Sequence, residues 1–338
     1  MDGLIKMHNK YYDRLEKKVG FYELNTDSFD DFINLLRPDN YIINDLMTRL
    51  RIKGTIPDEY PENLKLYNLD SSIIYRGHGD SEWELKSTFD RIQQRYCQVP
   101  FFLDGHRIEL EYLKKFQQSC DLAGVIIPSD SNEIRQKQFL NYYYPNESLD
   151  KNEFKYDWFN NAFYELAAFA QHHGVPTRLL DWFKNPFVAS YFANANALEQ
   201  QYEVGKKLSI WVLNFEDLGS EIKKVLKILD LPKGINQHIS HQQGVLTYVE
   251  LGLETYQLLT IKNKNNTLID SYTLNEVFHH FNNDYRLLKI NLEFDYCKRL
   301  YRYCNAHNFN ACNLFRGANG AALHTKDIIN YENFKHYE

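Results

Sequence analysis

One stretch of the sequence, residues 170–193 (AQHHGVPTRLLDWFKNPFVASYFA), strongly limits how this chain can fold. Its first residues end an apolar helical segment, Gly174 stands where a C-cap glycine belongs, and Pro176 prevents the helix from resuming. The short apolar run TRLLDW is typical of a buried strand. Asn185 and Pro186 then suit the N-cap and the first position of another helix. The stretch therefore predicts helix, turn, strand and helix in close succession.

Other segments predict helices and strands in irregular alternation. Helical spacing of apolar residues predicts a helix over 25–37, with Thr26 or Asp27 as its N-cap, and another over 107–118. Strands are predicted within 71–80 (SSIIYRGHGD), 208–215 (LSIWVLNF) and 241–252 (HQQGVLTYVELG). This pattern favours an α+β fold, in which helices flank a central, mostly antiparallel sheet that can be split.

The chain reads as one domain, because no repeat, low-complexity tract or Gly/Ser linker divides it. Residues 1–20 are polar and are expected to form a loose N-terminal arm, which leaves 21–338 as the domain. Residues 253–300 are rich in Asn and Lys with mixed helical signals, so we expect a helical insertion near 253–300.

Charge and cysteine content exclude several classes of protein. The net charge is -6, from 39 basic and 45 acidic residues, which argues against a nucleic-acid coat or a membrane-surface protein. The five cysteines are widely spread, and no N-terminal apolar run resembles a signal peptide, so a cytoplasmic protein with reduced thiols and no membrane partner is expected. The absence of a Cys-x-x-Cys pair argues against a structural metal at Cys304, His307 and Cys312.

Arg76 is the first candidate for the chemistry of a site. It directly follows the apolar run that ends at Tyr75 and precedes Gly77, so it is expected near the open end of a buried strand. A guanidinium there can make bidentate contacts to phosphate or carboxylate, and the glycine lets a ligand approach the backbone. The alternative is a structural ion pair at the end of the sheet.

A second group of candidates follows the helix that ends near residue 173: His172, His173, Thr177, Arg178 and Asp181. On a strand, Thr177 and Asp181 lie on one face, and Arg178 and Trp182 on the other. A buried aspartate needs a partner, so Asp181 is expected to meet Arg76 or a histidine. The alternatives are that His172 caps the helix and that Arg178 and Asp181 form salt bridges that fix the fold.

The remaining catalytic candidates are Gln243, as a polar side chain at the start of a strand, and Glu250 and Glu109, as an acid or base. Gln243 precedes a glycine and a predicted strand, Glu250 lies near the other end of that strand, and Glu109 lies on the 107–118 helix. Glu250 is equally compatible with a solvated strand end, and Glu109, like Glu111 on the same helix, is more often a surface helix charge. The sequence contains no GxGxxG, GxxxxGK[ST], HExxH or GxSxG motif, which argues against dinucleotide-fold, P-loop, zincin and α/β-hydrolase chemistry.

Five blocks of the sequence, in the expected order over about residues 20–330, resemble the FRG domain family, which is named for an (F/Y)RG motif. The longest match is the opening stretch, 170–193. The other blocks are 75–91 (from the Arg-Gly pair to a Ser/Thr-x-x-Arg segment), 107–118 (a helix with a Glu), 240–247 (a Gln-x-Gly-x-Phe-Thr block) and 314–323 (the closing block).

This chain departs from the family pattern at three positions. Phe183 follows Leu-Asp-Trp where the family has Thr or Ser, Leu246 stands in place of Phe, and His238 in place of Arg. The loss of a hydroxyl at position 183 weakens any mechanism that needs a donor there.

A more distant resemblance is to ADP-ribosyltransferases, whose split sheet holds NAD between three strands. Three features of this chain are similar to that plan in their order and in their residue types. They are Arg76, the TRLLDWF strand with the helix that follows it, and the HQQGVLTYVE strand. The resemblance implies NAD as co-substrate. It also implies roles for the candidates: Arg76 or Arg178 on the pyrophosphate, Tyr75 or Trp182 on nicotinamide, Glu250 or Gln243 at the ribose cation, and Gly77, His173, Thr177 and Asp181 around the cofactor.

Three hypotheses follow. The first is an enzyme that transfers ADP-ribose from NAD to a protein or nucleic acid, as a bacterial toxin or antiphage effector would, with a cognate antitoxin as a candidate partner. The second is a binding module for a phosphate-bearing ligand or nucleic acid. The third is a buried polar network that only specifies the fold. Under the first two, we expect His173, Thr177, Arg178 and Asp181 at the rim of a cleft floored by Arg76.

Overall fold

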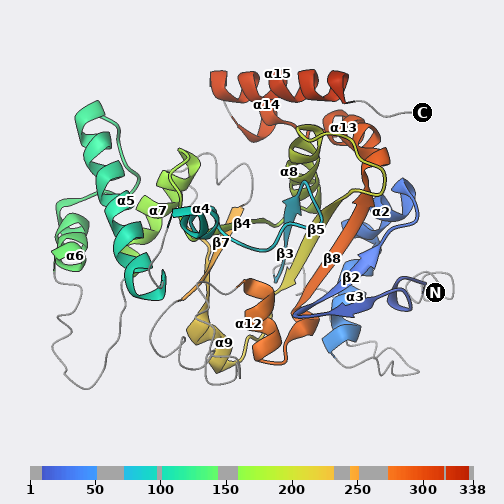
Figure 1. Cartoon of the computed structure of the whole chain (residues 1–338), viewed down its shortest axis with the longest axis horizontal. Coiled ribbons are helices and arrows are strands. Elements are labelled where there is room, and N and C mark those ends of the chain that lie inside the picture. The colour runs from blue at the N-terminus through green and yellow to red at the C-terminus, as the bar shows by residue number, and fades with distance from the viewer. Residues whose placement is uncertain are drawn as a thin grey trace.

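The computed structural model describes residues 10–51, 72–96, 101–143, 159–231, 244–250, 273–315 and 317–334. In this part of the chain, eight strands form one sheet in the order β1-β2-β8-β5-β3-β4-β7-β6 (Figure 1). The strands are β1 (Glu16–Lys18), β2 (Phe21–Asn25), β3 (Ile73–His78), β4 (Leu180–Phe183), β5 (Lys207–Asn214), β6 (Leu226–Leu229), β7 (Gly244–Val249) and β8 (Leu287–Glu293).

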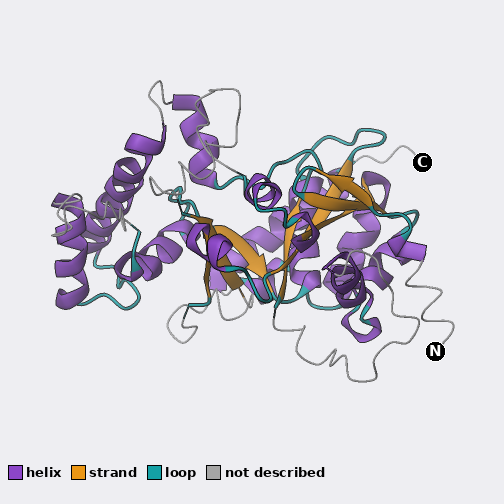
Figure 2. Ribbon diagram, turned by 90° about the horizontal axis from the view of Figure 1, so that it is seen from below, coloured by secondary structure: helices purple, strands orange, loops and turns teal. Residues whose placement is uncertain are grey.

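Strand pairing in this sheet is antiparallel except between β2 and β8. Helices cover both of its faces (Figure 2). The prediction of an α+β fold with a central, mostly antiparallel sheet flanked by helices is therefore confirmed.

The sheet opens between β3 and β4. β3 pairs with β5 along its whole length, from Ile73 to His78, but it pairs with β4 only where Tyr75 faces Phe183. Beyond that pair the two strands no longer run in register, and their backbone groups are available to other partners. We call the region where β3 and β4 separate the split.

The helices divide into a lobe at one end of the molecule and layers on the two faces of the sheet (Figure 1). The lobe comprises α5 (Phe101–Ala123), α6 (Asn132–Tyr143) and α7 (Asn161–His172), and α4 (Thr88–Tyr96) lies near it. The other helices are α2 (Phe29–Leu36), α3 (Ile42–Arg51), α8 (Pro186–Leu198), α9 (Ser220–Val225), α12 (Leu274–His280), α13 (Cys297–Ala306), α14 (Ala311–Leu314) and α15 (Gly317–Asn333).

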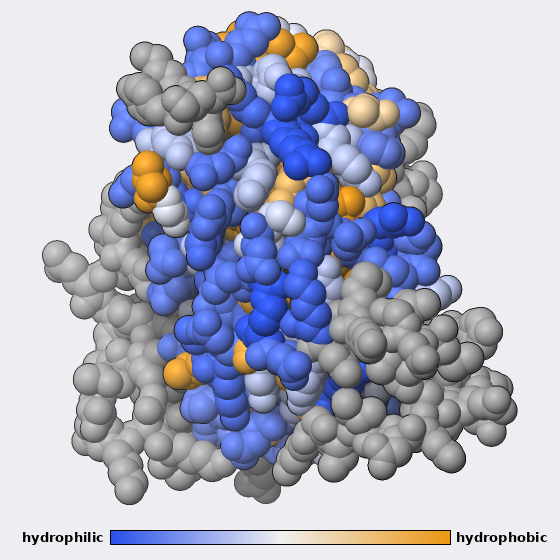
Figure 3. All heavy atoms as spheres, turned by 90° about the vertical axis from the view of Figure 1, so that its right-hand side faces the viewer, coloured by the Kyte–Doolittle hydropathy of each residue, from blue (hydrophilic) through white to orange (hydrophobic). Residues whose placement is uncertain are grey.

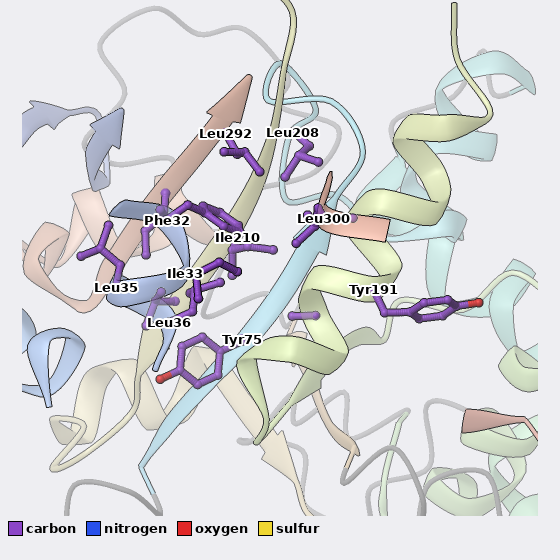
Figure 4. Packing of buried hydrophobic residues seen from close by; sticks show 14 of the residues in the cluster. Phe32, Ile33, Leu35, Leu36, Tyr75, Tyr191, Leu208, Ile210, Leu292 and Leu300 are labelled. Atoms are coloured by element: carbon purple, nitrogen blue, oxygen red, sulfur yellow. The ribbon is translucent and has the colours of Figure 1, made fainter. Parts of the chain in front are cut away.

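The two faces of the sheet carry different cores. On the α8 face, side chains of β5 and β8 pack with α2, α8 and α13, and Figure 4 shows Tyr75 lying toward Ile33 and Leu36 of α2. On the other face, which we call the α12 face, Ile74 and Trp211 pack with residues of α9 and α12. Since side chains alternate along a strand, Tyr75 and Arg76 point to opposite faces.

The close packing of α8 on β3 depends on two glycines. A Cβ at Gly77 would overlap the carbonyl oxygen of Ala189 and lie 2.7 Å from the backbone nitrogen of Ala193. A Cβ at Gly79 would lie 2.7 Å from the nitrogen of Ala197. The alanines recur at a spacing of four, so one small-residue stripe of α8 faces the strand.

The two helices and the turn of the opening stretch are confirmed, but the strand β4 begins at Leu180, so Thr177 and Arg178 precede it. α7 ends at His172, and Gly174 has φ 83°, the left-handed conformation of a C-terminal glycine. Asn185 accepts a hydrogen bond from the backbone nitrogen of Phe187 and caps α8, with Pro186 at its first position. The predicted N-cap of the 29–36 helix was wrong by one residue, because Ser28 accepts the bond from Asp31.

Residues 10–20, which were expected to belong to a loose arm, are packed against the domain. Tyr11 is 2% exposed, and β1 forms the edge of the sheet. All three β1 residues are exposed and charged, which protects an edge strand from pairing with other chains. The surface on this side of the molecule is mainly hydrophilic (Figure 3). The expectation was wrong here because a short edge strand carries no apolar pattern.

The expected helical insertion near 253–300 was also wrong for the residues described there. Leu287–Glu293 is β8, which pairs with both β2 and β5 in the interior of the sheet. Its neighbour α12 is helical and begins with a capping box between Thr273 and Glu276. Residues 253–272 lie outside the described part of the chain. No helix among the described residues is long and apolar enough to cross a bilayer.

We predict that Gly77→Ala lowers the free energy of unfolding by about 3 kcal/mol or more, because its Cβ would meet helix backbone that cannot move without shifting α8. Gly219→Ala is the control, since nothing lies within 4 Å of its Cβ; it should cost less than about 1 kcal/mol. Urea denaturation measures both. Equal losses in the two variants would contradict the packing account.

Candidate functional site

The guanidinium of Arg76 lies in the split. Its Nη1 donates to the backbone carbonyl of Asp181 at 2.8 Å, and its Nε donates to Nε2 of His78 at 3.1 Å. Arg76 therefore occupies the opening where β3 and β4 no longer bond to each other. The prediction that Arg76 and Asp181 meet is confirmed, but the contact is to the backbone oxygen of Asp181.

His78 holds the Arg76 side chain from the α12 face. Its Nε2 accepts from Arg76, so the ring proton belongs on Nδ1, where the carbonyl of Trp83 is 3.2 Å away. This tautomer satisfies both contacts, although the indole Nε1 of Trp211 also lies 3.2 Å from Nδ1. Burial and the adjacent Arg76 charge hold the pKa of His78 well below its usual range. The neutral ring is thus a fixed acceptor for Arg76.

On the other side of the split, polar side chains form a chain of hydrogen bonds. Gln171, at the end of α7, donates to the Asp181 carboxylate at 2.6 Å. Thr177 donates in turn to the side-chain oxygen of Gln171. These contacts join the end of α7 and the turn after it to β4, and the Asp181 carbonyl of β4 accepts from Arg76 of β3. The structure thus brings Arg76, Thr177 and Asp181 into one network, as the sequence predicted.

A second arginine, Arg91 of α4, acts on the split through its charge, while its guanidinium donates to the Lys86 carbonyl at 2.9 Å and to Oγ1 of Thr88 at 3.2 Å. Its charge acts on both Arg76 and His78 and lowers the pKa of each. Burial is the main cause that lowers the pKa of Arg76, to about 10, while Asp181 opposes that shift. Burial also lowers the pKa of Arg91, against the influence of Asp90. Both arginines remain charged at neutral pH, and their repulsion is relieved by a nearby anion.

We call the set Arg76, His78, Arg91, Gln171, Thr177 and Asp181 the split site. Three of its members, His78, Gln171 and Arg91, were not among the predicted site residues. Arg91 stood in the Ser/Thr-x-x-Arg segment of the 75–91 block, and this spacing is the signal that could have identified it. His78 and Gln171 lie next to predicted residues, but nothing in the sequence indicated that their side chains point into the split.

Arg178, predicted to bind a ligand, is instead part of a buried ion pair. Its Nε lies 2.8 Å from Oε2 of Glu109, and Oε1 of the same carboxylate accepts from the Arg178 backbone nitrogen at 2.8 Å. The guanidinium also lies over the ring of Phe89. The two ionic side chains are 4% and 0% exposed. The salt-bridge alternative therefore holds for Arg178, and the pyrophosphate role was wrong.

Glu109, predicted as a catalytic acid, is the buried partner in this pair. Burial raises its pKa to about 7, against the opposing effect of Arg178. Such a shift is also found at catalytic carboxyls. Here the side chain is 0% exposed, and both of its oxygens are directed to Arg178. Its geometry is that of a structural residue that fastens α5 to the segment before β4.

Trp182, Tyr75 and Gly77 were predicted to contact a cofactor, but they do not take part in the split site. Trp182 is 0% exposed and donates its indole hydrogen to Thr247 at 2.9 Å, as an inward-facing residue of a central strand. Tyr75 points to the α8 face, away from Arg76. Gly77 is required by the approach of α8 and not by a ligand.

The remaining predicted residues lie apart from the split site or outside the described residues. The ring of His173 packs on Phe169 and Phe116 at the end of α7. Glu250 follows β7, where its backbone nitrogen donates to the carbonyl of Val225 at 2.6 Å. Burial, and after it the Glu250 carboxylate, raises the pKa of Tyr248. Gln243 lies outside the described residues. No group of three potential metal ligands occurs among the residues that the structure describes.

We predict that Glu109→Gln destabilises the protein by about 3–5 kcal/mol, because it leaves the Arg178 charge buried without a carboxylate. The matched control is Glu133→Gln, which breaks an exposed contact to Lys137 on α6 and should cost less than about 0.5 kcal/mol. Chemical denaturation monitored by circular dichroism measures both. A Glu109→Gln variant of unchanged stability would return Glu109 to the catalytic candidates.

Comparison with known families agrees with three of the five sequence blocks, 75–91, 107–118 and 170–193, and does not reach the blocks 240–247 and 314–323. Residues 71–202 match the family model of the FRG domain, a range that runs from β3 past the end of α8 and contains every residue of the split site. Searches of the curated proteins and of the solved structures found no significant match. This match covers part of the chain and agrees with the resemblance of residues 71–202 to the FRG domain.

Proposed function

We propose that the split site binds a phosphate-bearing nucleotide. The observation that carries this proposal is the position of Arg76, whose guanidinium fills the opening between β3 and β4 and is held there from both sides. An arginine fixed in this way loses little conformational freedom when a ligand binds, so more of the contact energy appears as affinity.

Hydrogen-bonding capacity supports the proposal. A guanidinium has five N–H groups. Among the described residues, Asp181 and His78 take one each, from Nη1 and Nε. Three N–H groups, two of them on Nη2, are left for a ligand oxygen. Arg91 acts on Arg76 electrostatically, so a phosphate bound at Arg76 also lowers the repulsion between the two arginines.

We further propose that the nucleotide is NAD and that the chain transfers ADP-ribose from it to a protein or nucleic acid. The strand order supports this extension, because β3, β4 and β7 are adjacent. Arg76 lies on β3, the Leu-Asp-Trp segment lies on β4, and Glu250 directly follows β7. In such chemistry the pyrophosphate is held by arginine, while the bond to nicotinamide breaks and a cation develops on the ribose.

The extension to ADP-ribosyl transfer needs a group that stabilises the ribose cation. Glu109 is enclosed with Arg178 and cannot supply it. Glu250 and Gln243 were both predicted to stabilise the ribose cation. We assign this role to Glu250, because Gln243 lies outside the described residues. Nucleotide binding at Arg76 does not depend on this assignment, so the two parts of the proposal are tested separately.

For binding, we predict that pyrophosphate, ADP or NAD binds the wild-type chain and that Arg76→Lys weakens binding at least about tenfold, or 1.4 kcal/mol. Lysine keeps the charge but loses the planar fork of donors. Arg299→Lys is the matched control, since that arginine is exposed and pairs with Asp30. Isothermal titration calorimetry gives the affinities, and melting temperatures verify folding. No binding of any of the three compounds to folded protein would refute the proposal.

For catalysis, we predict that incubation with NAD and cell extract releases nicotinamide, measured by mass spectrometry, and that release is lost in Glu250→Gln and in Arg76→Lys. Glu250→Gln should leave the affinity for ADP unchanged, because the acid acts on the ribose and not on the phosphates. Binding without nicotinamide release in any mixture would reduce the function to the recognition of a phosphate-bearing ligand.

A further inference from the structure

We propose a second ligand site, for the vicinal hydroxyl groups of a sugar or ribose, on the α12 face at the other end of the sheet. An open hollow of about 720 Å³ lies there among β1, β2, β8, α12 and the loop that follows β3. Phe21, Glu23 and Lys289 belong to its lining, together with Glu82 and His279. Its volume is within the range of small-molecule sites.

The floor of the hollow is built from buried polar groups. Lys289 is 7% exposed, and its ammonium lies 3.1 Å from Oε1 of Glu23. Asn291 donates to the same oxygen at 2.9 Å. Burial opposes ionisation of Glu23, but the bonds from Asn291 and Lys289 outweigh it and lower the pKa of the carboxyl. The floor therefore holds a charged donor and a charged acceptor side by side.

Two buried polar atoms lie on neighbouring strands of the sheet beside this floor, one on β5 and one on β8. Ser209 and Asn291 are paired across β5 and β8, and Ser209 is 0% and Asn291 4% exposed. Among the described residues, neither Oγ of Ser209 nor Oδ1 of Asn291 has a hydrogen-bond partner. Buried polar atoms of this kind are rare in native proteins and call for a partner such as water or a ligand group.

The charges around the hollow select the class of ligand. Each lysine of the lining already has a carboxylate within hydrogen-bond distance, so the lining favours a neutral ligand over an anion. A hydroxyl can donate to a carboxylate and accept from an ammonium at the same time. The pairs are Lys17–Asp284 at 3.0 Å, Lys18–Glu16 at 2.8 Å and Lys289–Glu23 at 3.1 Å.

Phe21 supplies the apolar wall that a sugar needs. Its ring lines the hollow and packs edge-on against Trp211, with the Lys289 ammonium 5.7 Å from the ring centre. The C–H faces of a sugar ring pack on such a wall, while its hydroxyls reach Glu23 and Lys289. Glu82, on the exposed loop after β3, is a further acceptor at the rim.

Ligand-observed NMR titrations test this site with methyl β-D-ribofuranoside, methyl α-D-glucopyranoside, adenosine and 2′,3′-dideoxyadenosine. We expect at least one diol-bearing compound to bind and Lys289→Met to weaken it at least tenfold. Preference for the glucoside identifies a free sugar as the ligand. Preference for adenosine, with dideoxyadenosine at least tenfold weaker, identifies the ribose of a nucleoside. Absence of binding by all diol-bearing compounds would overturn the proposal.

Two further variants keep the test decisive if Lys289→Met does not fold. Glu82→Gln changes an exposed acceptor at the rim and should weaken the same compound without changing the melting temperature. The matched control is Lys326→Met on α15, which breaks an exposed ion pair with Glu199. This variant should bind the compound normally. Unchanged affinity in both Lys289→Met and Glu82→Gln would place any observed binding elsewhere and refute the site.

Discussion

The buried ion pair between Glu109 and Arg178 determines where the segment before β4 lies, and the split depends on that position. Two bonds of 2.8 Å join the Glu109 carboxylate to the side chain and to the backbone of Arg178. Three residues later the chain presents the Asp181 carbonyl to Arg76. Because a buried charge that loses its partner is very costly, α5 and β4 are held in one relative position.

Arg76 and Arg178 show how the surroundings of a side chain decide its use. Both were predicted to bind phosphate, and both are neighbours of the same short strand. Arg178 is enclosed by a carboxylate and an aromatic ring, so its charge is already compensated. Arg76 is held by two neutral groups, a backbone carbonyl and an imidazole, and so keeps its charge for a ligand. This difference is the reason for assigning binding to Arg76 alone.

Much of the fold could be predicted from local signals, because the caps and breakers around Gly174 and Asn185 act within a few residues. Asp181 was expected to meet Arg76 through its carboxylate, but the backbone carbonyl accepts from Arg76 and the carboxylate accepts from Gln171. The roles of Trp182 and Glu109 could not be predicted, since burial depends on what packs above a side chain. A buried ion pair and a catalytic pair have the same residue types in sequence; only the exposed fraction distinguishes them.

The order of the strands was equally beyond local signals. β8 enters the sheet between β2 and β5, far from either in sequence, and its polar residues Lys289 and Asn291 concealed its central position. These polar residues are buried because neighbouring strands supply Glu23 and Asn25 as partners. A pattern of hydrophobic alternation cannot reveal such compensation, which exists only after distant segments have come together.

The most direct measurement of the central claim is a crystal structure of the chain grown with ADP. The account predicts phosphate oxygens within about 3 Å of Arg76, with the Asp181 and His78 contacts retained and Arg91 turned toward the same oxygens. Phosphates bound elsewhere, with Arg76 enclosed by protein groups alone, would contradict it and leave the split site as a structural network.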